Sequence, residues 1–596
     1  MNSAKSSNFA RVAAISPQLS LGNVHYNSEE IIKKIKSHNK NGVEVIVFPE
    51  LCLTGYTCGD LFLQDIIHSA SQQALLDIVD KTKKCTSINI IGMPFKFDGR
   101  LFNCAIVIGQ GNIYGVVPKV FMPNTNEFYE KRWFSSGASI KGLNVEIGNH
   151  TNIPFGIDLI FESFAKNWKL GIEICEDLWS VIPPSSLQAL NGANIIANLS
   201  ASNDLVGKSK YRRELVSQQS ARCVSGYIYT SSGFGESTTD LVFSGHRIIA
   251  ENGIILNEDD NFSSSKDAIV ADLDIKMLDH DRYVNTGFKS SHFKSALRLI
   301  LLENNSNNSY EITRVDKRHP FVPSDKHERK DVCDQIFNIQ SAGLAQRLKH
   351  MGFPKPVIGI SGGLDSTLAL LVTVKAQEML SRSNKEIHAI TMPGFGTSKR
   401  TSDNSKNLIE GLGLEFNSIS INEAVKQHFN DINHDETNHD VVYENSQARE
   451  RTKILMDVAN QKNGMVVGTG DLSEAALGWC TFNGDHMSMY HVNIGVPKTL
   501  VQYIIESCIK MDQFKNISDT LTSILETPIS PELLPPDESG KILQETELTV
   551  GPYEVHDFFL YHFCRYGRSP KEIFDRACKV FKEDFDKKSM LGYLEI

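Results

Sequence analysis

The sequence predicts an α/β protein, in which short buried strands and amphipathic helices form layers around more than one core. One observation is that apolar runs of strand length occur in both halves of the chain, together with segments of helical spacing. A second is that several of these runs stop at a glutamate, a lysine or a cysteine, a usual place for site residues. A third is the length of 596 residues. At roughly 100 to 200 residues per domain, this length predicts two to four domains.

In the first half, three predicted strands each end at one reactive side chain. The apolar run Val43–Phe48 is followed by Glu50, and the run that begins at Tyr114 stops at Lys119. The third run, Lys169–Cys175, alternates strictly between two faces, as a strand does. The other elements expected in this half are strands at Arg11–Ser16, Ile88–Met93, Ala105–Gly109 and Ile269–Leu273, and helices at Ser28–His38 and Asp281–Leu302.

Glu50, Lys119 and Cys175 together suit the hydrolysis of an amide. A thiol attacks a carbonyl carbon only as thiolate, and acidic neighbours are expected to raise the pKa of Cys175. These neighbours are Glu173, Glu176 and Asp177. Lys119 would offset their charge and stabilise the oxyanion, while Glu50 would accept the thiol proton and pass it to the leaving ammonia. The residue types alone also allow a capping glutamate, a solvated lysine and a buried cysteine.

In the second half, Lys355–Val374 (KPVIGISGGLDSTLALLVTV) predicts a strand, a glycine loop and a helix. Adjacent glycines let the backbone approach a ligand, and the helix N-terminus that follows attracts anions. Ser361 and Ser366 add hydroxyl donors. No lysine follows the glycines, so this is not the loop that grips terminal phosphates in P-loop NTPases. We expect a nucleotide-phosphate site here, with an ordinary strand-to-helix turn as the alternative.

A polar turn follows the next strand expected in this half, Ile387–Met392. The spacing predicts that Ser402 or Asp403 caps a helix from Asn404. Ser398 and Asp403 are weaker candidates for the nucleotide site. The remaining elements expected are helices at Asp331–Leu348 and around 443–451, and a strand at Met465–Gly468.

The strand at Met465–Gly468 ends in another glycine turn, which opens a helix that carries Glu474. Mg²⁺ prefers one or two carboxylates together with phosphate oxygens. We therefore expect Asp365 and Glu474 to share Mg²⁺ on the phosphates of a nucleotide. Helix capping is the competing explanation for both carboxylates.

Composition narrows the class of protein. The net charge of -10, without a long basic run, argues against a nucleic-acid or membrane-surface partner. The 11 cysteines form no CxxC pair and are odd in number, which fits reduced thiols in a cytoplasm better than a disulfide framework or a zinc site. The N-terminus MNSAKSSNFA has no apolar signal core, and no run of about 18 apolar residues occurs. We expect a cytoplasmic protein without a membrane span.

Three motifs of the first half resemble the glutaminase members of the nitrilase-type amidase family. They are FPELCLTGY around Glu50, VPKVFMPNTNEFYEKRWF around Lys119 and GIEICEDLW around Cys175. The resemblance implies a nitrilase-like αββα sandwich over residues 1–300. It makes Glu50 the general base, Lys119 the electrostatic partner, Cys175 the nucleophile and Glu127 an auxiliary glutamate.

The resemblance also implies a place for glutamine. The segment NLSASNDLVGKSKYRRE is similar to the glutamine-binding loop of that family, which makes Ser202 and Lys208 contacts of the substrate's amino-acid end. Six residues after Lys119, where many relatives carry tyrosine, this chain has Thr125. Thr125 is the third residue that the resemblance places at glutamine.

The second half resembles the ATP pyrophosphatases and, within them, NAD synthetases. The motifs are ISGGLDST, YENSQARER, GTGDLSEAALGW and GVPKTL. The resemblance implies a Rossmann-like adenine nucleotide α-hydrolase (PP-loop) domain with a parallel sheet over residues 331–596. The polar run ENNSNNS (303–309) is the best linker candidate, within a linker at 301–330. The residues implied at ATP are Gly359, Ile360, Ser361, Gly362, Gly363, Leu364, Asp365, Ser366 and Thr469, and those at deamido-NAD⁺ are Asn445 and Glu474.

Both halves together resemble the glutamine-dependent NAD synthetase family. This implies that glutamine is hydrolysed and that its ammonia, kept unprotonated inside the protein, amidates deamido-NAD⁺ through an acyl-adenylate formed from ATP. It also implies a homo-oligomer. Three alternatives stay open: another PP-loop amidotransferase, a stand-alone nitrilase-type amidase with an ATP-sensing domain, and a non-catalytic assembly protein. A dinucleotide requirement separates the first, and glutamine hydrolysis without ATP turnover would indicate the second.

Overall fold

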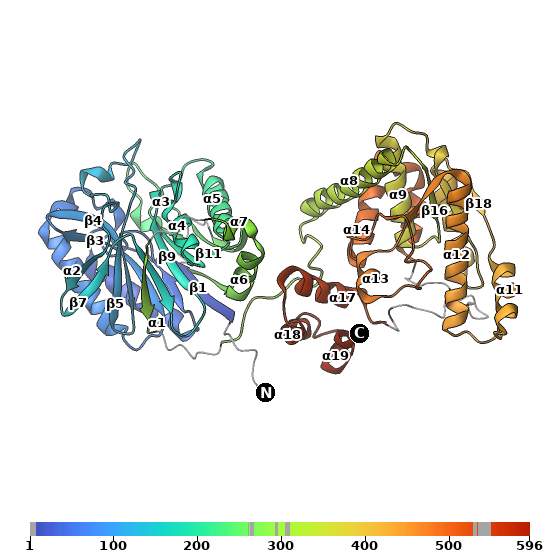
Figure 1. The fold of residues 1–596 in the computed structure, drawn as a ribbon. Coiled ribbons are helices and arrows are strands. Elements are labelled where there is room, and N and C mark those ends of the chain that lie inside the picture. Colours follow the sequence, from blue (N-terminus) through green and yellow to red (C-terminus); the bar gives the residue numbers. More distant parts are fainter. Residues whose placement is uncertain are drawn as a thin grey trace. The chain divides into compact units, whose positions relative to one another are not determined.

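The computed structural model describes residues 8–259, 262, 268–291, 296–303, 310–527, 533–534, 547 and 550–596. The chain divides into two compact units, Met1–Arg314 (unit 1) and Val315–Ile596 (unit 2). Figure 1 shows unit 1 in blue to green and unit 2 in yellow-green to red. In the described part of the chain, we find no helix with the length and apolar character that crossing a membrane requires.

Two β-sheets form the centre of unit 1. The strands of the first are β1 (Phe9–Ile15), β2 (Val45–Val47), β3 (Ile88–Phe97), β4 (Arg100–Gly109), β5 (Asn112–Pro118), β6 (Leu143–Ile147), β7 (His150–Phe155) and β14 (Ala268–Asp274). The strands of the second are β8 (Leu159–Ser163), β9 (Lys169–Ile174), β10 (Ile195–Ser200), β11 (Gly226–Ser231), β12 (Arg247–Glu251), β13 (Ile254–Asp259) and β15 (Arg298–Leu302). Across the described residues their orders are β14-β1-β2-β3-β4-β5-β7-β6 and β13-β12-β11-β10-β9-β8-β15.

Helices cover the outer face of each sheet, so unit 1 is an αββα sandwich. On the first sheet lie α1 (Val24–Lys40) and α2 (Asp65–Lys81), and on the second lie α4 (Pro184–Leu190) and α5 (Lys208–Cys223) (Figure 1). Both faces of strand β1 are apolar because each packs into a core. Val12 and Ala14 pack between the sheets, whereas Ala13 and Ile15 pack against the outer helices. The shorter elements are α3 (Glu176–Trp179), α6 (Ile275–Val284), α7 (Thr286–Lys289), η2 (Tyr56–Leu63), η3 (Glu130–Arg132) and η4 (Phe234–Glu236).

The prediction of one helix over Asp281–Leu302 is wrong. Helix α6 ends at Val284, because Asn285 is extended and its side chain accepts a hydrogen bond from Phe288 N, which starts α7. Residues 298–302 form β15, which pairs in parallel with β8. As a strand, residues 298–302 form hydrogen bonds with the backbone groups along the edge of β8. As a helix, they would leave that edge without these bonds.

Unit 2 is built on a parallel sheet. Its strands are β16 (Lys355–Gly359), β17 (His388–Thr391), β18 (Asn417–Ser418), β19 (Gly464–Gly468) and β20 (Tyr490–His491), and their order in the described part is β18-β17-β16-β19-β20. Every pairing is parallel. From β16 the strands β17 and β18 follow on one side, and β19 and β20 follow on the other side. The strand order therefore reverses between β16 and β19. Ligands of open α/β sheets bind at the carboxyl ends of strands at such a switch point.

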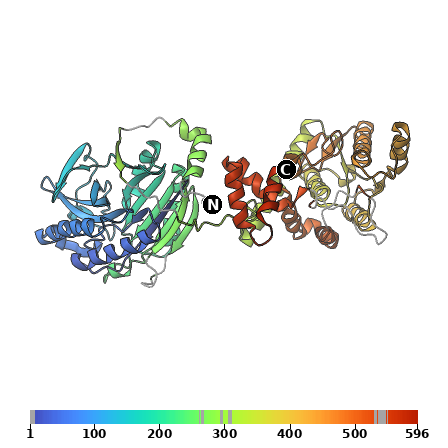
Figure 2. The ribbon, with the colours of Figure 1, turned by 90° about the horizontal axis from the view of Figure 1, so that it is seen from below.

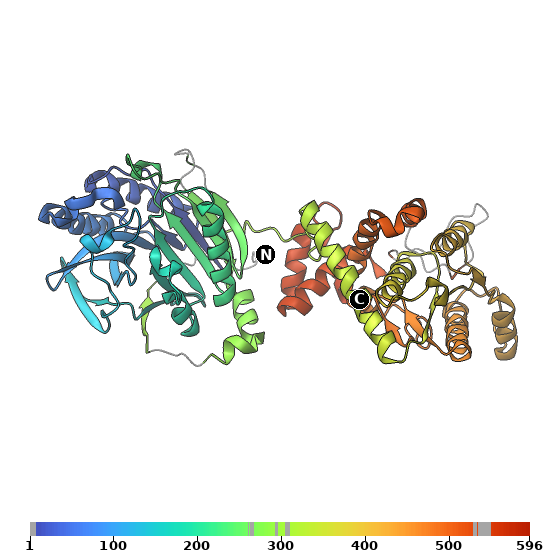
Figure 3. The same cartoon turned by 90° about the horizontal axis from the view of Figure 1, so that it is seen from above.

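Helices cover both faces of this sheet, as a parallel sheet requires. They are α8 (Lys326–His350), α9 (Leu364–Met379), α10 (Lys399–Gly411), α11 (Asn422–Ile432), α12 (Val441–Lys462), α13 (Leu472–Leu477), α14 (Lys498–Ile509) and α15 (Ser518–Leu525), with short turns η5 (Asn384–Glu386) and η6 (Asp512–Ile517). Helix α9 is buried on nearly all sides because it packs with α8 and α14 into one core. Figure 3 shows α8 as one long yellow-green helix.

The chain ends in a cluster of helices with its own small core. It comprises α17 (Tyr553–Leu560), the π-helical turn η7 (Tyr561–Arg565), α18 (Pro570–Val580) and α19 (Lys587–Glu595). Figure 2 shows these helices gathered together in red. Phe558, Phe581 and Met590 fill the core of the cluster.

One boundary of unit 2 differs from the prediction. Helix α10 begins at Lys399, where Ser398 Oγ accepts a hydrogen bond from Thr401 N, so the predicted cap at Ser402 or Asp403 is wrong. Because the Ser398 side chain caps the helix, α10 starts at the next residue. In the expected linker 301–330, residues 304–309 of the polar run lie outside the described residues. Residues 310–314 belong to unit 1.

Candidate active sites

In unit 1 the ends of strands from both sheets deliver three predicted site residues to one place. Glu50 follows β2, Lys119 follows β5 and Cys175 follows β9. Strand β10 joins the two sheets here: Glu50 N donates to Ser200 O at 3.3 Å, and Cys175 N donates to Leu199 O at 2.9 Å. Glu50 and Cys175 are therefore both held by backbone hydrogen bonds at the end of the same strand.

Both strand ends carry strained backbone. Leu51, directly after Glu50, has φ 50°, and Cys175 has φ 46° and ψ -102°. Residues other than glycine rarely adopt positive φ, and such strain gathers at functional sites. The turn at Cys175 ends β9 and starts α3, so the thiol stands at a sharp bend between strand and helix.

One lysine serves two buried carboxylates in this site. Lys119 Nζ donates to Glu50 Oε1 at 2.6 Å and to both carboxylate oxygens of Glu130 at 2.8 and 2.9 Å. All three side chains are buried. Burial by itself would lower the pKa of Lys119, but the two carboxylates outweigh it and raise that pKa. Burial raises the pKa of Glu130 to about 7, and Glu50 adds to that rise, while Lys119 opposes it.

The pKa of Cys175 is raised, first by burial and then by the charge of Glu50, whereas Lys119 lowers it. The sequence pointed instead to the flanking carboxylates as the cause. The side chains of two of them are engaged elsewhere: Glu173 accepts hydrogen bonds from Ser185 N and the Tyr227 hydroxyl, and Asp177 accepts three from backbone N–H groups. The buried thiol is therefore harder to deprotonate than an exposed one.

The predicted glutamine-binding residues lie beside one another. Lys208 Nζ donates to Asn203 Oδ1, and Asn203 Nδ2 donates to Glu127 Oε1 at 2.7 Å. Ser202, next to Asn203, accepts a hydrogen bond from Arg212 Nη2 at 3.2 Å. Burial lowers the pKa of Lys208, and Cys175 is among the groups whose charge opposes that effect. Thr125 is exposed, and its backbone oxygen accepts a hydrogen bond from Phe128 N at 3.0 Å.

In unit 2 the predicted nucleotide residues line one cavity of about 710 Å³. All of 359–366 line it, together with Thr469, Asn445 and Glu474. Gly362 has φ 88°, and a side chain there would come within 2.6 Å of Thr401 O. The loop therefore needs glycine to hold this shape. Ser398 and Asp403, the weaker candidates, are not among the lining residues.

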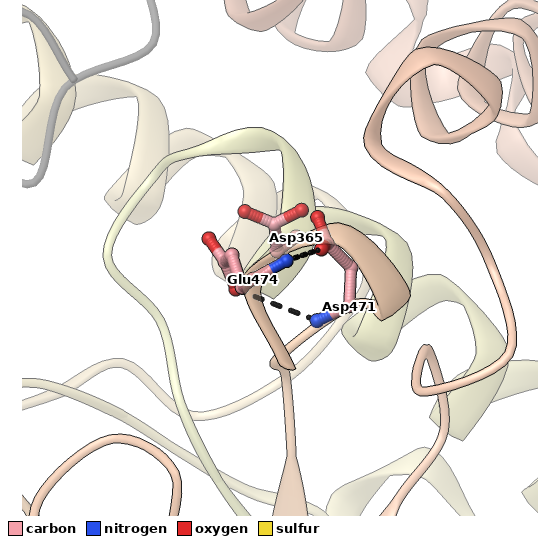
Figure 4. Close-up of side chains that lie close together, drawn as sticks. All are labelled: Asp365, Asp471 and Glu474. Atoms are coloured by element: carbon pink, nitrogen blue, oxygen red, sulfur yellow. Dashed lines mark hydrogen bonds between the residues drawn. The ribbon is translucent and has the colours of Figure 1, made fainter. Parts of the chain in front are cut away.

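Three carboxylates converge at the mouth of the glycine loop, as Figure 4 shows. They are Asp365 in the first turn of α9, and Asp471 and Glu474, which form a capping box at the start of α13. Lys498 Nζ lies 2.7 Å from Asp365 Oδ2 and 2.8 Å from both Asp471 Oδ2 and Glu474 Oε1. Burial raises the pKa of Asp471 to about 8 and also raises that of Glu474.

Comparisons with known proteins cover both units. A family model described as carbon-nitrogen hydrolase matches residues 11–283, and one described as NAD synthase matches residues 336–576. A glutamine-dependent NAD(+) synthetase of Mycobacterium leprae (strain TN) is 39% identical over 581 residues, which cover 95% of this chain and 85% of that protein. The chain belongs to the glutamine-dependent NAD(+) synthetase family.

Other glutamine-dependent NAD(+) synthetases are similar over nearly the whole chain. The protein of Mycobacterium tuberculosis (strain ATCC 25618 / H37Rv) is 39% identical over 578 residues, which cover 95% of this chain and 84% of that protein. The protein of Aquifex aeolicus (strain VF5) is 28% identical over 561 residues, which cover 93% of this chain and 89% of that protein. The predicted nitrilase-like fold followed by a PP-loop synthetase fold is thereby confirmed.

Sequence reasoning missed three residues of these sites in this family member. The auxiliary carboxylate was expected at Glu127, but the glutamate that contacts Lys119 is Glu130, three residues later. In unit 2, Asp471 and Lys498 complete the charged cluster. Lys498 is the lysine of the motif GVPKTL, and its place at the start of an apolar helix was the available signal.

Proposed function

We propose that this chain makes NAD⁺ from deamido-NAD⁺, with ATP and glutamine as the other substrates. Membership of the glutamine-dependent NAD(+) synthetase family supports the overall reaction. The observation that carries the assignment of unit 1 is the convergence of Glu50 and Lys119 on the strand end that bears Cys175. This arrangement supplies a base, a cation and a nucleophile for amide hydrolysis.

In unit 1, the proposed reaction starts with transfer of the Cys175 thiol proton to Glu50. The sulfur attacks the side-chain carbonyl carbon of glutamine, and Lys119 stabilises the oxyanion that forms. The carbon–nitrogen bond then breaks, and Glu50 returns the proton to the leaving nitrogen, which departs as ammonia. Water hydrolyses the thioester to glutamate and restores the thiol. The raised pKa of Cys175 makes the adjacent base necessary for the first step.

The polar group at Glu127, Ser202 and Lys208 suits the amino-acid end of glutamine. Glu127 offers a carboxylate to an ammonium group, and Lys208 offers an ammonium to a carboxylate. Aromatic rings of Phe128 and Trp179 lie 5.3 and 5.8 Å from Lys208 Nζ and confine it. We assign these three residues to the binding of glutamine. Thr125, which is exposed and lies two residues before Glu127, would add a further contact to glutamine.

In unit 2, the loop 359–366 is proposed to bind the phosphates of ATP. Its N–H groups and the start of α9 form a positive end to which phosphate oxygens bind. The carboxylate of deamido-NAD⁺ is a poor electrophile, so it attacks the α-phosphate, and pyrophosphate leaves. Ammonia then displaces AMP and leaves the amide. Asn445 and Glu474, which line the same cavity, are assigned to deamido-NAD⁺, and Thr469 to ATP.

The charged cluster in unit 2 fits a divalent cation. Three carboxylates lie around a single ammonium group, that of Lys498, and this leaves the cluster short of positive charge. Asp365 and Glu474 would hold Mg²⁺, with phosphate oxygens as its other ligands. When bound, Mg²⁺ offsets the charge that develops on the phosphates. Lys498 keeps the carboxylates together and holds its own charge beside them.

The test is to incubate the protein with ATP, Mg²⁺, deamido-NAD⁺ and either glutamine or ammonium, and to measure NAD⁺, AMP and pyrophosphate. We expect Cys175→Ala to lose the glutamine reaction and keep the ammonium reaction, because only the first needs the thiol. Asp365→Ala should lose both. Cys85→Ala, at a buried thiol outside this site, is the matched control and should keep both.

Each contrary result points to one alternative. If Cys175→Ala uses glutamine as well as the wild type does, the thiol assignment is wrong. Glutamine hydrolysis without ATP turnover would indicate an amidase with an ATP-sensing domain, and amidation of another acid would indicate a different amidotransferase. We also propose that the enzyme works in the cytoplasm and that it is a homo-oligomer. Light scattering of the purified protein would test the homo-oligomer.

A further inference from the structure

We propose that Asn103 is a positioning residue of glutamine hydrolysis, which holds Glu50 so that its Oε2 atom accepts the thiol proton. This inference rests on the proposed function of unit 1. Asn103 Nδ2 donates to Glu50 Oε1 at 2.6 Å, and the amide is buried with only 1% of the residue exposed. No motif in the sequence pointed to this residue, because a single asparagine within an apolar strand carries no signal of its own.

The position of Asn103 is fixed by the sheet. It lies on β4, opposite Pro94 of β3, and its carbonyl oxygen accepts a hydrogen bond from Lys119 N at 2.8 Å. Asn103 therefore contacts the lysine strand through its backbone and the base through its side chain. A rigid strand at this place sets the distance between Glu50 and Lys119.

The two oxygens of Glu50 have different surroundings. Oε1 accepts from both Asn103 Nδ2 and Lys119 Nζ, each at 2.6 Å. Oε2 is buried and has no hydrogen-bond partner among the described residues. Two donors occupy one oxygen and leave the lone pairs of the other free. Oε2 is thus the atom that takes the proton from Cys175 Sγ as sulfur bonds to the substrate carbon, and that gives it to the departing nitrogen.

The orientation of the amide follows from charge. A carboxylate only accepts hydrogen bonds, so the NH₂ group of Asn103, and not its oxygen, must face Glu50. The other titratable groups around Glu50 are Lys119, Glu130, Cys175 and Tyr56, whose hydroxyl donates to Glu130 at 2.7 Å. Among them Lys119 alone is cationic, and Glu130 shares it. Lys119 thus divides its hydrogen bonds between Glu50 and Glu130, whereas the Asn103 amide donates to Glu50.

The experiment compares Asn103→Leu and Asn103→Asp with the wild type in the full chain. The readout is glutamate release from glutamine, as kcat/KM between pH 5.5 and 9, with ATP, Mg²⁺ and deamido-NAD⁺ present. Without the amide donor, the anionic form of Glu50 is less stabilised. We expect Asn103→Leu to lower kcat/KM about 10- to 100-fold at pH 7 and to move the acid limb to higher pH.

Asn103→Asp separates a positioning role from a merely structural one. The introduced carboxyl donates to Glu50 only while protonated, so activity should recover towards low pH and fall at high pH, with an optimum below that of the wild type. Asn103→Leu should show no such recovery. The ammonium-dependent reaction of unit 2 should stay unchanged in both variants. Thermal unfolding followed by circular dichroism checks separately that unit 1 of each variant folds.

Asn89→Asp is the matched control. Asn89 is buried on β3 and bonds to Ser87 without contacting Glu50, so its pH profile should remain that of the wild type. The inference is overturned if both Asn103 variants keep the wild-type profile, or if they lose activity equally at every pH. A wild-type protein without glutaminase activity would instead overturn the proposed function of unit 1.

Discussion

Lys119 holds two carboxylates with one charge, so this buried cluster is short of one positive charge. Glu50 and Glu130 both bond to its Nζ atom, and none of the three side chains reaches solvent. Two neighbouring carboxylates seldom both ionise readily out of water. The burden falls on Glu130, whose pKa is raised to about 7 by burial, helped by Glu50 and opposed by Lys119. Glu130 therefore takes up a proton near neutral pH.

This predicts how the stability of unit 1 depends on pH. The pKa of Glu130 rises from an ordinary value of 4.5 to about 7 in the folded protein, chiefly because the side chain is buried, so the folded state binds the proton more tightly. Its contribution to stability is complete below about pH 4.5 and is lost as pH rises through about 7. Glu130→Gln, which stays neutral, should therefore gain stability relative to the wild type between pH 5 and 8. Differential scanning fluorimetry at several pH values measures this.

Glu146→Gln is the control for that comparison, because Glu146 is exposed on β6. Its melting temperature should follow the wild type at every pH. A Glu130→Gln curve parallel to the wild-type curve would show that Glu130 does not change its protonation in this range.

For single residues, the sequence indicated which residue types could act in a site. It did not indicate which side chains contact one another. Glu50, Lys119 and Cys175 could be found because each follows an apolar run. The choice between Glu127 and Glu130 could not be made, because both stand in the same irregular segment, EFYEK. A contact between segments distant in sequence, such as that of Asn103 with Glu50, leaves no local pattern.

Among the helices, α17 supports the unit 2 cavity from outside the parallel sheet. Asp557 accepts hydrogen bonds from the Ser473 hydroxyl, from Thr499 N at 2.9 Å and from Thr499 Oγ1 at 2.6 Å. Ser473 Oγ in turn accepts from Lys498 N at 2.9 Å. One buried carboxylate thus joins the starts of α13 and α14, which carry Glu474 and Lys498.

Asp557→Ala should lower the glutamine-dependent and the ammonium-dependent rates together, by about 10-fold or more, because both need the unit 2 cavity. The KM for ATP should rise, and glutamine hydrolysis by unit 1 should remain. Steady-state assays with each nitrogen donor measure this. Glu583→Gln, at an exposed position of the same C-terminal cluster, should behave as the wild type. Loss of the glutamine reaction alone would contradict this role for Asp557.

Elements could be predicted where periodicity and turn chemistry agreed. The run Lys355–Val374 gave the correct strand, loop and helix because glycines separate two clear patterns. The prediction of an element was wrong where pairing with a strand distant in sequence determined its structure. Residues 298–302 carry an apolar run that fits either helix or strand, and the edge of β8 selected the strand.

For the whole molecule, each unit has its own hydrophobic cores, and a short segment closes unit 1. Tyr310 OH donates to Glu44 Oε1 at 2.8 Å, and its ring lies 4.1 Å from the Arg11 guanidinium. Thr313 N donates to Asp272 Oδ2 at 2.8 Å, and Arg314 pairs with Glu251. The segment 310–314 therefore covers buried charges along β1, β14 and β12.

This predicts where unit 1 can be separated from unit 2. A fragment of residues 1–314 should fold and unfold cooperatively, because the cores of the sandwich lie within it. A fragment of residues 1–303 should melt at a lower temperature, since Arg11, Glu44 and Asp272 lose bonds from the segment 310–314. Thermal unfolding followed by circular dichroism compares the two. Equal melting temperatures would show that this segment adds nothing.

The unequal exposure of the thiols bears on chemical labelling. Cys175 is 6% exposed, whereas Cys480 is exposed and lines the unit 2 cavity. An alkylating reagent can therefore abolish synthesis through Cys480 before it reaches Cys175, and the reactions with both nitrogen donors would then fail. Inactivation by such a compound does not by itself identify the glutaminase cysteine. In a Cys480→Ser protein, selective loss of the glutamine reaction would report on Cys175, and covalent inhibitors of the two units could be sorted in this way.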